Sequence, residues 1–245
     1  MMLRTEKINL SIGGLRILKD VTADMAQGQV TSIIGPNGAG KTTLFNVITG
    51  RMAPTSGRVF FEGAEITGLP PYEIARRGIA RSFQITNIFP DMTVFENVSI
   101  AAQTRSSCRT SIMTRVSADR ETAAEAASVV ELIGLTGVGR KAAHELSHGD
   151  RRRLEVGMSL AIGPQFLMLD EPTSGMSPAE TEGTIDLIRS LGKKVTICLI
   201  EHKMHLVMTV SDKVIVLNLG EKIAEGTPAE VAANERVQEV YLGTA

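Results

Sequence analysis

The sequence is poor in cysteine and has no long apolar stretch. Only two of its 245 residues are cysteines, Cys108 and Cys198, and neither belongs to a metal-binding or redox motif. A reduced compartment suits such a chain. No apolar run approaches the roughly 18 residues that a membrane-spanning helix needs, and the segment MMLRTEKINL has no signal-peptide core. If the protein works at a membrane, we expect another chain to cross it.

A strong charge of either sign is also missing. The formal net charge is −1, which gives no reason to expect general binding to nucleic acid. The sequence contains no internal repeat and no low-complexity segment, and its length allows one α/β domain with a core or two small lobes. We interpret the arginine triplet Arg151–Arg153 as a solvated helix face, with contact to a partner subunit as the alternative.

The segment GPNGAGKT matches the P-loop pattern G-x-x-x-x-G-K-[ST]. An apolar strand precedes it at Thr31–Ile34, and a helix is expected from Lys41 to Gly50. Glycines let main-chain N–H groups turn inward around an anion, and the helix N-terminus adds partial positive charge. We expect Lys41 to reach the β- and γ-phosphates and Thr42 to bind Mg²⁺. The alternative is a glycine-rich turn without a ligand. The expected phosphate contacts are Gly35, Pro36, Asn37, Gly38, Ala39, Gly40, Lys41, Thr42 and Thr43.

Two carboxylates follow an apolar run. Phe166–Leu169 predicts a buried parallel strand, which places Asp170 and Glu171 at its carboxyl end, where open α/β sheets bind ligands. Asp170 suits a Mg²⁺ site, and Glu171 can polarise the attacking water. A solvated strand end is the alternative.

Several segments predict helices and their boundaries. LSHGD opens a helix with Leu154, Met158 and Ala161 on one face, and its N-terminus is a second anion-binding position. A capping box is expected at Ser177–Glu180, and another at Thr227–Glu230 begins a final helix. An alanine-rich helix is expected over residues 118–133, and Gly134 ends it. Its predicted apolar face consists of Ala123, Ala127, Val130 and Ile133.

An isolated histidine, His202, follows the apolar strand Val195–Ile200. Such a histidine is often only a partly buried polar residue. The pairs His144/His148 and His202/His205 have helical spacing, but each supplies two ligands and no cysteine is near, so we expect no zinc site.

The order of these segments resembles the nucleotide-binding subunits of ATP-binding cassette (ABC) transporters. The resemblance implies that Ser147 and Gly149, within LSHGD, contact the γ-phosphate that the other subunit holds. It implies that His202 hydrogen-bonds this phosphate and serves hydrolysis together with Lys41 and Glu171. Taken without the order of the other segments, LSHGD predicts only the N-cap of a helix.

The same resemblance assigns two further contacts. Gln84, in RSFQ, senses Mg²⁺ and couples to the membrane subunit, so the implied metal ligands are Thr42, Gln84 and Asp170. Ile12, in NLSIGG, stands where the family usually has an aromatic that stacks on adenine. The chain also departs from the family at the positions His148, Asp150 and Ser177; we expect Asp150 to point away from the phosphate.

The segments RSFQ, IFPDMTVFENV, LSHGDRRRLE, IEHKM and KIAEGTPAEVAANERVQEVYLG resemble one branch, the ATPase subunits of branched-chain amino-acid-type importers. The resemblance covers nearly the whole chain. It implies an α/β P-loop ABC ATPase with a parallel-sheet core, an antiparallel β part and a helical insert. The implied ATP-binding core is formed by residues 1–84 and 146–245, including a C-terminal helix, and the helical subdomain by residues 85–145.

The function that this resemblance implies is Mg²⁺-dependent ATP hydrolysis by a homo- or heterodimer at the cytoplasmic face of the inner membrane. The partners are permease subunits and indirectly a periplasmic solute-binding protein. We expect the permeases to dock near Gln84–Phe95 and the helical insert, in a groove lined by Ile88, Phe89 and Phe95, with core packing as the alternative for at least one of the three. The ATPase of lipopolysaccharide export has a similar YLG tail and is the nearest alternative. A soluble ABC ATPase would call for long coiled coils or two cassettes, and a small-molecule kinase leaves LSHGD and His202 unexplained.

Overall fold

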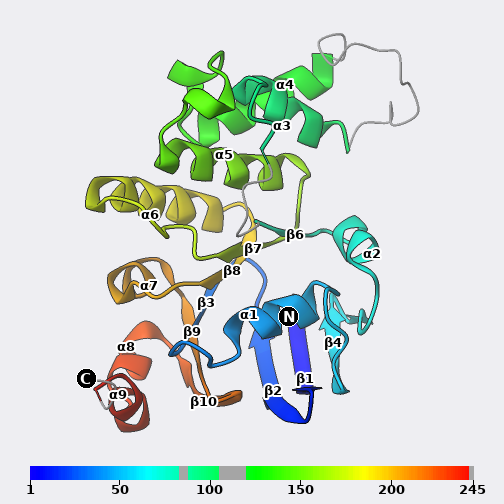
Figure 1. Cartoon of the computed structure of the whole chain (residues 1–245), viewed down its shortest axis with the longest axis vertical. Helices are drawn as coiled ribbons and strands as arrows, with labels where there is room; N and C mark the ends of the chain where they lie inside the picture. The colour runs from blue at the N-terminus through cyan, green and yellow to red at the C-terminus, as the bar shows by residue number, and fades with distance from the viewer. Residues whose placement is uncertain (83–87, 105–119, 243–245) are drawn as a thin grey trace. The chain divides into compact units, whose positions relative to one another are not determined.

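The computed structural model describes residues 1–82, 88–104 and 120–242. The chain forms two compact units (Figure 1). The first unit is built from both ends of the sequence, Met1–Ile79 and Ile188–Ala245, and the second from Ala80–Leu187. Within the described residues, no helix has both the length and the apolar character needed to cross a membrane.

The first unit contains an antiparallel sheet with the order β2-β1-β4-β5. Two adjacent glycines with positive φ, Gly13 and Gly14, join the long strands β1 and β2, whose end residues pair as Leu3 with Met25 and Ile12 with Leu15. The four strands are β1 (Leu3–Ile12), β2 (Leu15–Met25), β4 (Ser56–Phe61) and β5 (Ala64–Glu65). This sheet is the antiparallel part that the resemblance implies.

Parallel strands form the centre of the first unit. Strand β3 (Val30–Ile34) lies between β8 (Thr196–Ile200) and β9 (Lys213–Asn218) and runs parallel to both, while β10 (Glu221–Gly226) pairs antiparallel with β9. Every residue of β3 and β8 is buried, as expected for strands covered on both faces. Both strands lie where the apolar runs predict them. The helices of this unit are α1 (Lys41–Ile48), α2 (Pro71–Arg76), α7 (Met204–Val210), α8 (Pro228–Ala232) and α9 (Glu235–Leu242).

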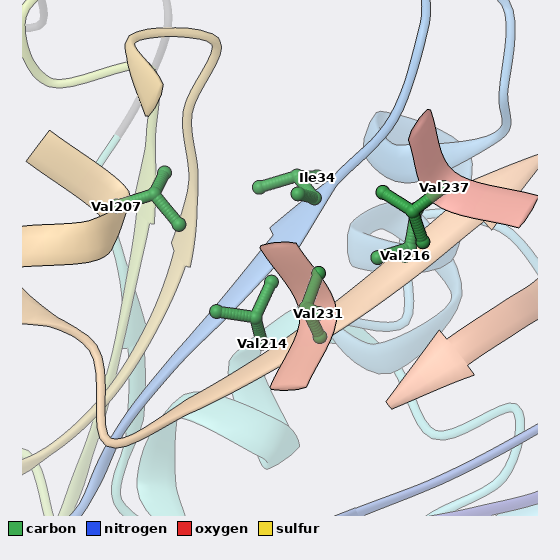
Figure 2. Packing of buried hydrophobic residues seen from close by; sticks show 6 residues of the cluster. All are labelled: Ile34, Val207, Val214, Val216, Val231 and Val237. Atoms are coloured by element: carbon green, nitrogen blue, oxygen red, sulfur yellow. The ribbon is translucent and has the colours of Figure 1, made fainter. Parts of the chain in front are cut away.

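A branched aliphatic cluster joins the C-terminal helices to the central strands (Figure 2). Ile34 ends β3, and the valines around it come from α7, β9, α8 and α9. The cluster consists of Ile34, Val207, Val214, Val216, Val231 and Val237. Apolar burial therefore holds the last helices against the strand that leads into the P-loop.

The single final helix expected from Thr227 is two helices. The predicted capping box is present, because Thr227 and Glu230 exchange side-chain and main-chain hydrogen bonds at the start of α8. The chain then turns at Asn234, whose side-chain oxygen accepts a hydrogen bond from the N–H of Val237 at 3.2 Å. Asparagine is a strong helix N-cap, so Asn234 begins α9 as a new helix.

The second unit combines two strands with packed helices. Strands β6 (Ile79–Arg81) and β7 (Phe166–Asp170) are neighbours, and α3 (Val94–Ala102), α4 (Arg120–Leu132) and α5 (His148–Ala161) pack on one another. Two short 3₁₀ turns occupy Thr136–Val138 and Ala143–Glu145. Helix α6 (Pro178–Gly192) contains the boundary between the two units, which falls after Leu187.

The predicted alanine-rich helix is α4, but its buried face is rotated from the expected one. Gly134 follows the helix with φ +72°, as predicted for its end. Ala127 is exposed and Ala123 is half-buried, so the expected face is wrong at these positions. The buried side chains of α4 are Thr122, Ala126 and Val130. The alanines of this helix are Ala123, Ala124, Ala126 and Ala127, and small apolar side chains at several spacings do not define one narrow face.

Candidate active site

The P-loop lies between β3 and α1, and its three glycines have different surroundings. All three have positive φ, +150° at Gly35, +79° at Gly38 and +97° at Gly40, which other residues rarely adopt. A Cβ on Gly35 would lie 2.0 Å from the carbonyl oxygen of Leu217, and one on Gly40 would lie 2.8 Å from Leu18. At Gly38 a Cβ would meet nothing within 4 Å. Two glycines therefore permit close packing, and the middle one leaves the main chain open to a ligand.

The side chain of Lys41 folds back over the P-loop that precedes it. Its side chain is buried, and its Nζ donates to the carbonyl oxygens of Gly35 at 2.8 Å and Pro36 at 2.9 Å. Phosphate oxygens accept the same hydrogen bonds, so a bound nucleotide can replace these partners. Helix α1 has Gly40 as its N-cap and no side-chain cap among the described residues. Its first N–H groups, next to Thr42 and Thr43, suit an anion.

Residues from the end of the chain brace the P-loop. The N–H of Gly220, in the turn between β9 and β10, donates to the carbonyl oxygen of Ala39 at 3.1 Å. The hydroxyl of Tyr241, on α9, accepts a hydrogen bond from the main chain at Gly35. Burial raises the pKa of Tyr241 to about 12, an effect larger than the opposing one of this hydrogen bond. Sequence reasoning missed Tyr241; its only signal was the YLG ending.

The expected base contact lies at the end of β1. Ile12 is 50% exposed, and its partner across the hairpin, Leu15, is 67% exposed. Two exposed apolar side chains side by side can offer contact to a planar base. The role of Ile12 in binding adenine stays a prediction.

His202 lies directly after β8 with an exposed side chain. The residue before it, Glu201, is buried, and its Oε2 accepts hydrogen bonds from the N–H groups of His202 at 2.9 Å and Lys203 at 3.2 Å. The carboxylate of Glu201 therefore fixes the main chain that carries His202. Sequence reasoning missed Glu201, whose signal is its place at the end of a buried strand.

In the second unit, Asp170 ends β7 and is completely buried. Its Oδ2 pairs with Nη2 of Arg81 at 2.6 Å, and the two side chains are 0% and 7% exposed. Its Oδ1 is also buried and has no hydrogen-bond partner in the described part of the chain. Mg²⁺ takes oxygen ligands, and an available carboxylate oxygen fits the predicted metal role. Arg81 was not expected from the sequence.

Glu171 has an unusual backbone conformation. Its φ is +48°, a value that residues other than glycine seldom adopt and that often marks functional sites. Its carbonyl oxygen accepts a hydrogen bond from the N–H of Ser174 at 3.1 Å, which closes a turn after the strand. The side chain is half-buried. The strand therefore ends in a turn whose main-chain hydrogen bond fixes the backbone of Glu171.

The expectation that the arginine triplet forms a solvated face is wrong at its centre. Arg152 is buried, while Arg151 and Arg153 are half-buried. Nη2 of Arg152 donates to the carbonyl oxygens of Asp170 at 2.7 Å and Glu171 at 3.2 Å, and its Nη1 pairs with Glu155 at 2.6 Å. Three consecutive residues span more than half a turn of a helix, so only the rotation of α5 decides which member points inward.

The LSHGD segment begins α5. Ser147 is its N-cap and accepts a hydrogen bond from the N–H of Asp150 at 3.1 Å. The N–H of Gly149 donates to Oε1 of Glu180 at 3.3 Å, while Oε2 of Glu180 accepts from both the N–H and the hydroxyl of Ser177. The predicted capping box at α6 is thus present. Hydrogen bonds from Ser177 lower the pKa of Glu180 most strongly, and its carboxylate occupies the donor that the resemblance assigns to a phosphate.

The predicted site residues divide between the two units. The P-loop, Ile12 and His202 belong to the first, whereas Asp170, Glu171, Ser147 and Gly149 belong to the second. Gln84 lies outside the described residues. Groups of three or more histidine, cysteine or acidic side chains that could hold a metal are not found among the residues described.

The sequence matches two protein-family models. Residues 18–174 match the family described as ABC transporter, which is more than half of the chain. Residues 221–245 match the family described as branched-chain amino acid ATP-binding cassette transporter. The second match contains the segment with α8, α9 and Tyr241.

Individual proteins resemble the chain over its full length. It is 39% identical to the high-affinity branched-chain amino acid transport ATP-binding protein BraF of Pseudomonas aeruginosa, over 100% of this chain and 98% of that protein. The identity and coverage are the same for LivG of Escherichia coli K12. Among solved structures, MJ1267, an ATP-binding cassette of an ABC transporter, has a TM-score of 0.87 at 34% identity and covers 98% of both chains. Its ADP conformation has a TM-score of 0.86 at 32% identity, covering 99% of this chain and 98% of that one.

Proposed function

Because this chain belongs to the ABC transporter family, we propose that it hydrolyses ATP to power the import of branched-chain amino acids or related small solutes. The observation that carries this proposal is that two comparisons, one of the whole chain and one of its C-terminal segment, identify the same kind of transporter. Both the 39% identity over 100% of the chain and the separate match of residues 221–245 lead to branched-chain amino acid transport. The P-loop supplies the chemistry that such a subunit needs.

Nucleotide binding rests on the first unit. The open main chain at Gly38 and the N-terminus of α1 receive phosphate oxygens, and Lys41 exchanges its carbonyl partners for them. Thr42, Asp170 and Gln84 would hold Mg²⁺. When bound, this ion neutralises the charge on the phosphates.

Hydrolysis rests on Glu171 and His202. Glu171 accepts a proton from the attacking water as a general base, and the turn after β7 fixes its main chain. His202 donates a hydrogen bond to the γ-phosphate from a loop that Glu201 holds in place.

A second ATPase subunit, either another copy or a paralogue, completes each site. Ser147 and Gly149 at the start of α5 contact the γ-phosphate that the partner subunit holds. Glu180 now accepts the hydrogen bond from Gly149 at 3.3 Å, so the incoming phosphate has to replace a carboxylate. Both are anions, and the helix N-terminus favours either one.

The protein works as a peripheral subunit at the cytoplasmic face of the inner membrane, bound to integral-membrane permeases. A periplasmic solute-binding protein delivers the solute to those permeases. We place permease docking on the helical subdomain at residues 85–145, where Phe89 is 45% exposed and Ile88 and Phe95 are half-buried. An exposed aromatic on this surface suits burial against a partner.

Two substitutions test the assignment of binding and hydrolysis. Lys41→Ala should weaken ATP binding in an equilibrium titration, whereas Glu171→Gln should keep binding and slow steady-state phosphate release. The exposed Lys193→Ala and Glu131→Gln serve as charge-matched controls. Native turnover by Glu171→Gln would show that this carboxylate is not the base. With permeases co-expressed, uptake of labelled leucine should be lost in Glu171→Gln, and unchanged uptake would remove the proposed transport role.

A further inference from the structure

We propose that Arg152 is a positioning residue for Glu171 and joins the helix that begins at Ser147 to the site of water activation. The inference deepens the function proposed above, because it rests on Glu171 acting as the base. It concerns a residue that the sequence assigned to a solvated surface. The structure places its guanidinium on the main chain of the strand end instead.

The contacts of Arg152 single out the peptide groups around Glu171. One nitrogen, Nη2, donates to the carbonyl oxygen of Asp170 at 2.7 Å and to that of Glu171 at 3.2 Å. These two carbonyls flank the Cα of Glu171, and their orientation sets where the carboxylate points. The φ of +48° at Glu171 is a sparsely populated conformation, and such conformations persist where surrounding contacts fix them. Arg152 supplies such contacts from a buried position.

Glu155 holds the other end of the guanidinium. It lies one turn later on α5, its side chain is 7% exposed, and its Oε2 lies 2.6 Å from Nη1 of Arg152. The pair neutralises both charges inside the protein, as buried ion pairs require. Arginine suits this arrangement because its planar fork can bind a carboxylate and a carbonyl at the same time.

The first two turns of α5 therefore carry two groups of residues with different proposed roles. Ser147 and Gly149 at its start are the residues proposed to meet the partner's nucleotide, and Arg152 in the next turn binds the main chain of Glu171. Arg152 thus links the first turns of α5 to the main chain of Glu171 within one chain.

The test compares Arg152→Gln with Arg151→Gln. Arg151 also donates its guanidinium to a carbonyl, that of His144 at 2.6 Å, so it is a control of matched chemistry. Arg152→Gln should lower kcat about 10-fold to 100-fold with KM for ATP within about twofold, because a misplaced base slows the chemical step and leaves binding intact. Arg151→Gln should turn over near the native rate. Glutamine is smaller than arginine, so it fits the space of Arg152 without overpacking.

Single-turnover hydrolysis in a second background decides whether Arg152 acts through Glu171. In Glu171→Gln protein, adding Arg152→Gln should cause no further loss, because the group being positioned is gone. An equal loss in both backgrounds, or a native rate in Arg152→Gln, overturns the inference. If Glu171→Gln itself turns over at the native rate, the assignment of the base fails instead. If Arg152→Gln folds poorly, Arg152→Lys replaces it in the test, because lysine keeps the charge but lacks the planar fork. Arg152→Lys must then lower kcat while ATP affinity and the thermal midpoint of unfolding stay native.

Discussion

The ion pair between Arg81 and Asp170 allows a quantitative test of burial in the second unit. The atoms Nη2 and Oδ2 lie 2.6 Å apart, and the side chains are 7% and 0% exposed. Arg81→Met keeps most of the apolar volume and removes the charge that compensates Asp170. Breaking a buried pair in this way costs about 3–5 kcal/mol.

An exposed pair provides the matched comparison. Arg58 and Glu6 lie 3.1 Å apart, but their side chains are 60% and 27% exposed. Such surface pairs contribute about 0–1 kcal/mol, because water screens the charges. Arg58→Met should therefore change the free energy of unfolding by no more than that amount.

Urea unfolding followed by circular dichroism, without nucleotide and with a chelator, measures both changes. The double variant Arg81→Met/Asp170→Asn should recover most of the lost stability, because no unpaired charge remains buried. If Arg81→Met costs less than about 1 kcal/mol, as Arg58→Met should, the buried charge at Asp170 is not compensated by Arg81 and the reasoning fails.

Four further outcomes are expected. Ile12→Tyr should tighten ATP binding about fivefold, because stacking on a base is worth roughly 1–3 kcal/mol. The native protein should discriminate weakly between ATP and GTP. Competitive titration of both nucleotides measures both effects. Cysteines placed at Ser147 and Gly38 should crosslink between chains in the presence of ATP, and links confined to one chain would contradict the dimer. Tyr241→Phe removes the acceptor for the N–H of Gly35 and should lower the free energy of unfolding by about 1–2 kcal/mol in urea. The pKa of Glu180 is lowered in the folded protein, so its carboxylate stabilises the fold above the unfolded pKa, and this stabilisation is lost as pH falls through the folded pKa. In Glu180→Gln, the free energy of unfolding should therefore depend less on pH below about pH 4.5.

Local signals in the sequence predicted the elements that carry the site. The strand before the P-loop, the helix after it and both capping boxes lie where residue types require them, because each depends on neighbours within a few positions. Gly134 ends α4 for the same reason.

Contacts between distant segments could not be predicted in this way. Arg81 meets Asp170 across 89 positions, and Arg152 differs from its two neighbours only through the rotation of α5. The face of α4 was missed because alanines at several spacings give no periodic contrast. Tyr241 contacts Gly35 only because α9 packs on the central strands, and no residue near Gly35 in the sequence predicts this contact.

The first unit is built from both ends of the chain, and this has a consequence for its synthesis. Strand β3 pairs only with β8 and β9, in the described residues, and Gly220 and Tyr241 brace the loop that follows it. About 200 residues separate Lys41 from Tyr241, and a ribosome adds about 5–20 residues per second. The P-loop is therefore made on the order of 10–40 s before its last support exists. Nascent chains released early should carry the complete GPNGAGKT segment and still be unable to retain ATP.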